Sequence, residues 1–417
     1  MNKMNGLEFD IESSFGLYLH IPFCEGKCRY CDFYSTNFNT ADLNEYLSCL
    51  KQEIKIYSSL LRSSESKKTL FYSKMREQIK SANNNFHPQI ESIYIGGGTP
   101  GLLLPEQLLE ILDLIKTQFS YPLTGEITLE ANPDSLTEDK IAGYRGIGVN
   151  RLSLGVQSFN DKELSFLGRK HTGKDTVKTV HLIDHYFDNY NIDLIFALPG
   201  QGIDDWQYSL QEAISLGPHH ISLYNLQIEE NTPLAEELNQ GKFKTVDDSL
   251  DAEMYLLARE MLVNSGYHHY EISNFAQQGF QSSHNRIYWE FKPYLGLGPA
   301  AHSFTGKVRY NNYSDLNKYN DILASKSPIP ENLPIDNIIE LKKEDLIAEK
   351  LFMGLRLLEG VSLETFWEDF GVMLEDYYDH QIKKLKSLGL IEVSKKRITL
   401  TEKGLLHGNT VFMEFLP

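Results

Sequence analysis

Short runs of aliphatic, β-branched and aromatic residues recur along the first half of the chain and alternate with longer segments of helical periodicity. In the segment 108–115, for example, apolar residues recur at the spacing of a helix with one buried face. Strands that alternate with helices in this way predict βα units and a parallel sheet. The predicted strands are Leu17–Ile21, Ile93–Ile95, Ile127–Glu130, Arg151–Leu154, Ile192–Phe196 and His220–Leu226.

Residues capable of binding or chemistry lie where these predicted strands end. Three cysteines follow the first strand, the run Gly96–Thr99 follows the second, and Glu130 closes the third. Gln157 follows the fourth strand, and Asp193 lies within the fifth. The carboxyl ends of parallel strands share one rim, where α/β proteins bind their ligands. We therefore expect these side chains to converge on one site.

The pattern changes after residue 325. Three prolines between residues 328 and 334 predict a linker. Beyond them, two helical patterns precede two short strands, which predicts a small winged-helix-like α+β module; its elements are Lys342–Leu358, Glu375–Leu388, Leu390–Val393 and Arg397–Leu400. Earlier in the chain, the polar segment Arg62–Pro88 predicts a surface excursion between the first helix and the second strand.

The charge balance narrows the classes of partner. The formal net charge is −17, so no general electrostatic attraction draws the chain to nucleic acid, and we expect no nucleic-acid partner. The first residues show no basic segment followed by an apolar stretch, and no run approaches the roughly 18 apolar residues that span a bilayer. These features predict a cytoplasmic protein with no integral membrane segment.

Three of the four cysteines, Cys24, Cys28 and Cys31, form a C-x₃-C-x₂-C pattern. Without a secretory signal, such clustering predicts metal binding and not disulfides. Thiolates suit both zinc and iron–sulfur clusters. A structural zinc ion needs four protein ligands, for which His20 is the local candidate, whereas three cysteines leave one iron of a [4Fe–4S] cluster open. The spacing favours the cluster over zinc, and Cys49, in a predicted helix, is expected to be an inert thiol.

The segment 17–33 resembles the radical S-adenosylmethionine (SAM) superfamily, and most closely the oxygen-independent coproporphyrinogen III oxidase family, over nearly the whole chain. The resemblance implies an α/β fold, a partial (β/α)₆ TIM-like barrel followed by the winged-helix-like module. It implies a [4Fe–4S] cluster on the three cysteines, with its open iron chelated by SAM. The domains expected are a barrel over 1–240, a barrel extension over 241–325, a linker over 326–340 and the module over 341–417.

Other residues match positions that hold SAM in that family. Gly97, Gly98 and Thr99 match its glycine-rich segment, whose backbone lies against the methionine portion of the cofactor. Glycine suits this contact because a missing Cβ permits close approach. The remaining positions that match are Tyr18, Tyr30, Glu130, Gln157, Arg169 and Asp193.

Two features separate the branches of this family. The oxidase branch resembles the longer pattern C-x₃-C-x₂-C-x-C, with a further cysteine two residues after the third. This chain has Phe33 at that position. The segment 284–289 resembles the H-N-x-x-Y-W haem-binding motif of the haem chaperone branch, of the HemW type. Histidine is a common axial ligand of haem iron, and tyrosine and tryptophan offer apolar faces to a porphyrin. The resemblance therefore implies haem binding through His284, Tyr288 and Trp289.

The function favoured is a haem chaperone that transfers haem to an acceptor protein, whose identity the sequence does not give. One alternative is a coproporphyrinogen oxidase, against which Phe33 argues. Another is a different radical SAM enzyme, including one that acts on RNA, against which the acidic charge and the haem-like motif argue. A third is a module that binds SAM without cleaving it. Whether the chain is an enzyme is left open by the sequence.

Overall fold

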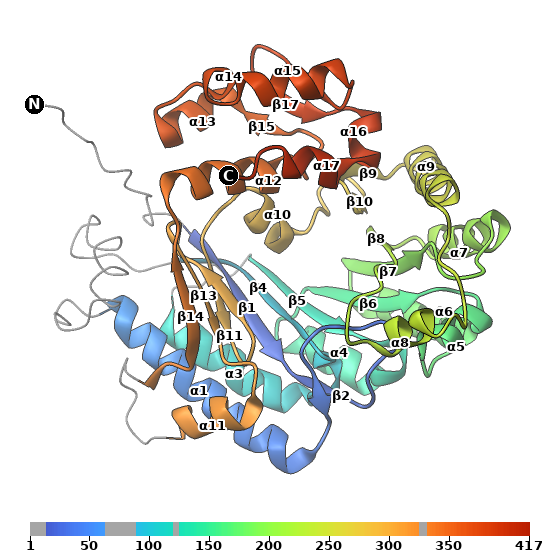
Figure 1. Ribbon diagram of the computed structural model, residues 1–417. Helices are drawn as coiled ribbons and strands as arrows, with labels where there is room; N and C mark the ends of the chain where they lie inside the picture. The colour runs from blue at the N-terminus through green and yellow to red at the C-terminus, as the bar shows by residue number, and fades with distance from the viewer. Residues whose placement is uncertain (1–13, 63–88, 120–124, 325–331) are drawn as a thin grey trace, which may run out of the picture.

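The computed structural model describes residues 14–62, 89–119, 125–324 and 332–417. A twelve-stranded sheet forms its centre, with the strand order β14-β13-β12-β11-β1-β4-β5-β6-β7-β8-β10-β9 (Figure 1). All six predicted strands are present and pair in parallel, in chain order. They are β1 (Ser14–Ile21), β4 (Gln89–Gly97), β5 (Glu126–Ala131), β6 (Arg151–Gln157), β7 (Tyr190–Phe196) and β8 (His220–Asn225).

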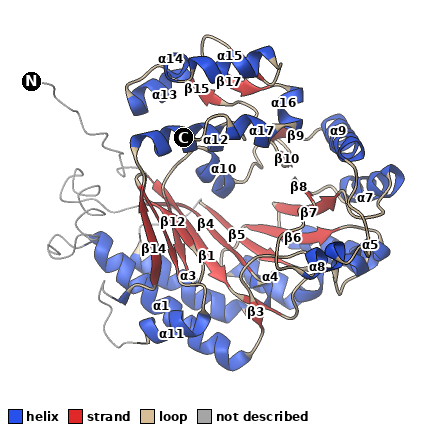
Figure 2. Cartoon of the chain, viewed as in Figure 1, coloured by secondary structure: helices blue, strands red, loops and turns tan. Residues whose placement is uncertain are grey.

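Helices connect these strands and cover one face of the sheet, as Figure 2 shows. This βα alternation confirms the predicted partial (β/α)₆ barrel. The connecting elements are α1 (Thr40–Arg62), η1 (Pro100–Leu102), α3 (Pro105–Gln118), η2 (Pro133–Ser135), α4 (Glu138–Gly146), α5 (Asp161–Leu167), α6 (Gly173–Tyr186) and α7 (Ile203–Ser215). The predicted excursion after Arg62 lies outside the described residues.

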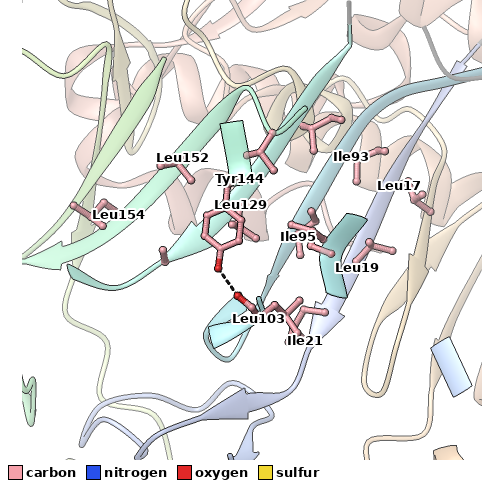
Figure 3. Close-up of a cluster of buried hydrophobic side chains, with 14 of the residues drawn as sticks. Leu17, Leu19, Ile21, Ile93, Ile95, Leu103, Leu129, Tyr144, Leu152 and Leu154 are labelled. Carbon is pink, nitrogen blue, oxygen red and sulfur yellow. Dashed lines mark hydrogen bonds between the residues drawn. The ribbon is translucent and has the colours of Figure 1, made fainter. Parts of the chain in front are cut away.

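Side chains alternate between the two faces of the parallel strands. Leu17 and Leu19 of β1 and Ile93 and Ile95 of β4 are buried against the helix layer (Figure 3). In the same layer, the hydroxyl of Tyr144 in α4 donates to the carbonyl of Leu103, 2.5 Å away. Since successive strand residues point to opposite faces, the intervening polar positions face the interior of the barrel.

Further strands extend the sheet at both edges. Beside β1 lie β11 (Tyr294–Leu297), in parallel, and then the antiparallel β12 (His302–Phe304), β13 (Val308–Asn312) and β14 (Ile335–Glu340). Beside β8 lie β10 (Asn274–Ala276) and β9 (His268–Glu271). Residues 335–340 of the predicted linker thus form an edge strand, because their isoleucines favour pairing. Helices α8 (Pro233–Asn239), α9 (Asp248–Asn264), α10 (Ser283–Trp289) and α11 (Leu316–Leu323) complete this part.

The C-terminal residues form a second layer with its own apolar core, which includes Phe366, Leu385 and Ile398. A three-stranded antiparallel sheet, β15-β17-β16, packs with short helices, in agreement with the predicted winged-helix-like module. Its elements are α12 (Lys343–Gly354), β15 (Val361–Ser362), α13 (Leu363–Phe370), α14 (Leu374–Tyr377), α15 (Asp379–Ser387), β16 (Ile391–Val393), β17 (Arg397–Leu400), α16 (Glu402–Leu406) and α17 (Gly408–Met413). Among the described residues, no helix has the length and apolar character needed to cross a bilayer.

Candidate functional site

The cysteine motif lies at the carboxyl end of β1. The chain leaves β1 at Ile21, and the two-residue strand β2 (Phe23–Cys24) pairs with β3 (Thr36–Asn37), which closes the loop between them. Cys24, Cys28 and Cys31 are partly buried free thiols on this loop. Burial, reinforced by the other two cysteines, raises the pKa of Cys31 to about 11. The loop therefore gathers three thiols at the predicted rim. Cys49, in contrast, is buried in α1, as expected.

Polar side chains that follow β4 and α5 contact two of these thiols. Thr99, after β4, places its hydroxyl 3.5 Å from the sulfur of Cys24. The guanidinium of Arg169 donates to the sulfur of Cys28 over 3.4 Å. Asn132, after β5, joins the two contacts, because its amide donates to Thr99 and its carbonyl accepts from Arg169 over 2.6 Å. A cavity of about 90 Å³ lies among Cys28, Thr99, Asn132 and Arg169.

The glycine run is required for this approach. A Cβ on Gly98 would lie 2.6 Å from the carbonyl oxygen of Phe23 and 3.0 Å from the sulfur of Cys24. Gly97 has a φ of +117°, a conformation that residues with a Cβ rarely adopt. The end of β4 can therefore lie directly against the cysteine loop only because both positions are glycine.

In the barrel interior, the carboxylate of Glu130 connects Tyr94 with the glycine run. One of its carboxylate oxygens accepts from the hydroxyl of Tyr94 over 2.6 Å, and the other accepts from the backbone N–H of Gly97 over 3.2 Å. Burial raises the pKa of Glu130 to about 7, and the hydrogen bond from Tyr94 opposes that rise. Asp193 accepts from Asn191 over 2.7 Å, and burial raises its pKa as well. The carboxyl groups of Glu130 and Asp193 thus both face the barrel interior.

The remaining predicted residues lie near the same rim. Gln157 ends β6 with a φ of +70°, and its amide lies 2.9 Å from where a Cβ on Gly155 would stand. Tyr18 is stacked on Tyr94, with ring centroids 6.3 Å apart. Burial raises the pKa of Tyr30, on which the charges of Arg169, Cys28 and Asp193 also act. Sequence reasoning missed Asn132 and Tyr94, although Asn132 carries the same strand-end signal as Glu130.

His284 lies farther from the rim, toward the amino ends of β1 and β4, beside Gly16 and Ser92. Its imidazole is fully buried. Nδ1 lies 2.8 Å from the hydroxyl of Ser92, and Nε2 lies 2.8 Å from the hydroxyl of Tyr288. Burial, followed by the charge of Arg151, lowers its pKa to about 3, so the ring is neutral at pH 7. Both ring nitrogens of His284 are therefore hydrogen-bonded within the protein.

The donor set suits an iron–sulfur cluster better than a single ion. Within the parts of the chain that the structure describes, no three His, Cys, Asp or Glu side chains converge as one metal ion requires. A [4Fe–4S] cluster is wider than an ion, and its three thiolates bind different irons. The hydroxyl of Thr99 beside Cys24 and the cation of Arg169 on Cys28 suit such an anionic group.

Known proteins resemble this chain over both of its layers. Residues 18–213 match the model of the radical SAM superfamily, and residues 341–407 match the HemN C-terminal domain. The heme chaperone HemW of Bacillus subtilis is 36% identical over 96% of this chain and 98% of its own length. HemW of Lactococcus lactis is 33% identical over 96% of each chain.

A solved structure supports the fold. Coproporphyrinogen III oxidase (HemN) from Escherichia coli, a radical SAM enzyme, superimposes with a TM-score of 0.78, covering 97% of this chain and 91% of its own. Its sequence identity is 22%, so the likeness concerns architecture. The HemW proteins share more sequence identity with this chain than HemN does, and they do so over nearly its full length. The chain belongs to the radical SAM superfamily and, within it, to the HemW family.

Proposed function

We propose that this chain is a haem chaperone, which binds haem and passes it to an acceptor protein. Similarity to the heme chaperone HemW of Bacillus subtilis along 96% of this chain carries the proposal. Phe33 supports it independently. This side chain is 66% exposed beside the cysteine loop and stands where the related oxidases have a further cysteine, so that position offers no thiolate.

We infer that Cys24, Cys28 and Cys31 hold a [4Fe–4S] cluster and that SAM binds at the adjoining rim. When bound, the cluster supplies one-electron chemistry to SAM. The cation of Arg169 would offset the negative charge of the thiolates. Gly97 and Gly98 let the end of β4 lie directly against the cysteine loop, which brings Thr99 to this site.

The interior acids would receive the donor groups of SAM. Glu130 and Asp193 are acceptors already oriented by Tyr94 and Asn191. An ammonium group needs such paired acceptors, because an unpaired charge in a partly dry cavity is costly. Tyr18, Tyr30 and Gln157 would complete the walls of this site.

For haem, we propose the segment His284, Tyr288 and Trp289. Since Nε2 of His284 is bonded to the hydroxyl of Tyr288, an iron–imidazole bond through Nε2 requires that hydroxyl to turn away first. The hydroxyl of Tyr288 would thus control whether Nε2 of His284 is free to bind iron. Trp289 is only partly buried, and its indole N–H has no partner among the described residues.

The experiment is anaerobic reconstitution of the cluster, followed by haem titration on the Soret band and an assay for conversion of coproporphyrinogen III. The proposal expects saturable haem binding and no turnover of coproporphyrinogen. Turnover without haem binding would replace the chaperone by the oxidase. An assay for 5′-deoxyadenosine in the same samples would determine whether SAM is cleaved.

A further inference from the structure

A cavity of about 470 Å³ lies where α9 and the end of β8 meet the C-terminal module. It shares no lining residue with the cavity beside the cysteines. Apolar and aromatic side chains form part of its wall beside polar ones that include Asp248 and Asp251, and its volume is typical of a small-molecule site. The apolar and aromatic residues that line it include Phe196, Leu223, Tyr255, Leu405, Leu406 and Phe412.

Arg356 lines this cavity without an acidic partner. Its guanidinium carbon lies 5.0 Å from the ring centre of Trp289, 5.2 Å from that of Phe352 and 5.4 Å from that of Phe412. Within the described chain, its guanidinium makes no hydrogen bond or ion pair, and its buried Nε has no partner. Other partly buried arginines differ: Arg309, for example, donates to the carboxylate of Glu349 over 2.6 Å.

A guanidinium that is stacked on aromatic rings and has no hydrogen-bond acceptor in the protein can bind an anion from outside. Guanidinium matches a carboxylate with two parallel hydrogen bonds, and leaving buried donors unsatisfied is costly. Packing against the rings fixes its long side chain, so little rotamer freedom is left to lose on binding. The feature is thus better explained by a ligand than by folding alone.

The neighbouring charges permit an anion at this position. Glu271 acts on Arg356 from beyond ion-pair distance, and burial raises the pKa of Glu271 to about 7, so it compensates the cation only in part. Asp251 is engaged by the amide of Asn225, and burial raises the pKa of Asp251. Asp248, also in the lining, and His407 are exposed. Arg356 is the only lysine or arginine in the lining.

Resting on the proposed haem-chaperone function, we propose that this cavity receives an edge of the haem and that Arg356 binds a propionate carboxylate. Haem combines a flat apolar macrocycle with two carboxylates, which corresponds to an apolar wall with one unpaired guanidinium. Trp289, on which Arg356 is stacked, ends the H-N-x-x-Y-W segment. One residue therefore joins that segment to the cavity.

The test compares haem with haem dimethyl ester, whose carboxylates are capped, by Soret titration of full-length wild type, Arg356→Met and Arg356→Lys. For haem, Arg356→Met should bind about 10- to 100-fold more weakly, the range for a hydrogen bond to a charged group. Esterification should weaken wild type by a similar factor and Arg356→Met no further. Arg356→Lys should lie between them, because it keeps the charge and loses the fork.

Arg259→Gln is the matched control. Arg259 pairs with Glu402 over 2.7 Å between α9 and the same module, outside the cavity lining, and its loss should leave haem affinity unchanged. Equal haem affinity of wild type and both Arg356 variants, or an ester penalty that persists in a folded Arg356→Met, overturns the placement while the chaperone function stands. Failure of wild type to bind haem overturns the function itself, and the placement with it.

Discussion

The ring of Tyr94 is stacked on the imidazole of His284, with centroids 5.2 Å apart. Its hydroxyl points onward to Glu130, over 2.6 Å. One side chain of β4 thus contacts both the proposed haem segment and the proposed SAM site. Tyr94 thus connects His284 with Glu130, although these two residues are more than 150 positions apart in the sequence.

Tyr94→Phe separates the two contacts of this tyrosine. Phenylalanine preserves stacking on His284 but removes the donor to Glu130, so the pKa of Glu130 should rise further above its usual value. Loss of one hydrogen bond to an orienting carboxylate should weaken SAM binding about 10-fold. Isothermal titration of the reconstituted protein measures this affinity, and the visible absorbance of the cluster should be unchanged. Wild-type affinity would remove Glu130 from the SAM site.

Replacing any of Cys24, Cys28 or Cys31 by serine should abolish the cluster, because each thiolate binds a different iron. Cys49→Ser is the matched control: its thiol is buried in α1 and reaches only the carbonyl of Asn320. Iron and sulfide analysis after anaerobic reconstitution gives the readout. Full iron content in a variant of the first three residues, or stoichiometric zinc in place of iron, contradicts the assignment.

His284 predicts a specific pH dependence of stability. Its pKa in the folded protein is about 3, below the value near 6.5 of an exposed histidine, so the unfolded chain binds the extra proton first. The stability that a neutral His284 contributes is therefore present above about pH 6.5 and is lost as the pH falls toward 3. Its share of the slope is at most about 1.4 kcal/mol per pH unit.

His284→Gln removes this titration while keeping a side chain that both donates and accepts hydrogen bonds. Urea unfolding of the variant at several pH values from about 4.5 to 7 should therefore show a shallower decline than wild type. Titrating groups common to both proteins cancel in the comparison. Parallel curves would mean that the imidazole is accessible to protons in the folded state.

A buried acid outside both proposed sites should contribute strongly to stability. Glu53 of α1 accepts from the hydroxyl of Tyr319 and the amide of Asn312, each over 2.6 Å, and from the backbone N–H of Gly298. Glu53→Ala leaves three donors without an acceptor, so unfolding should become easier by about 3 kcal/mol or more. Glu110→Ala, which breaks only an exposed pair with Lys51, should leave the stability nearly unchanged.

The βα order and most of the rim could be predicted because strand-end residues announce themselves locally. Cys24 and Glu130 lie on the rim where the strand-end pattern put them, and Arg169, which the family resemblance alone indicated, contacts Cys28 on the same rim. Tyr94 could not be assigned, because it lies between two isoleucines in a strand that is buried on both faces. Periodicity alone does not say which face of such a strand looks inward.

Other features depend on tertiary partners that no local pattern encodes. The sequence shows the motif that contains His284. It does not show the hydrogen bond between His284 and Ser92, because these residues are 192 positions apart. Arg356 lies within a predicted helix, and nothing local indicates that its guanidinium has no acceptor among the described residues. Ile335–Glu340 were assigned to a linker because nearby prolines outweighed a short apolar pattern, and only pairing with β13 reveals the strand.

The regular alternation of faces that β1 and β4 keep from Gly16 and Ser92 onward also protects the fold during its formation. In the native register Tyr18 is opposite Tyr94 and Leu19 is opposite Ile95. A slip of one residue would turn isoleucine side chains into the polar interior and press tyrosine hydroxyls against aliphatic helix residues. Each of these two changes destabilises the misaligned pair of strands. Misaligned strands should therefore separate and pair again before the helices pack on the sheet.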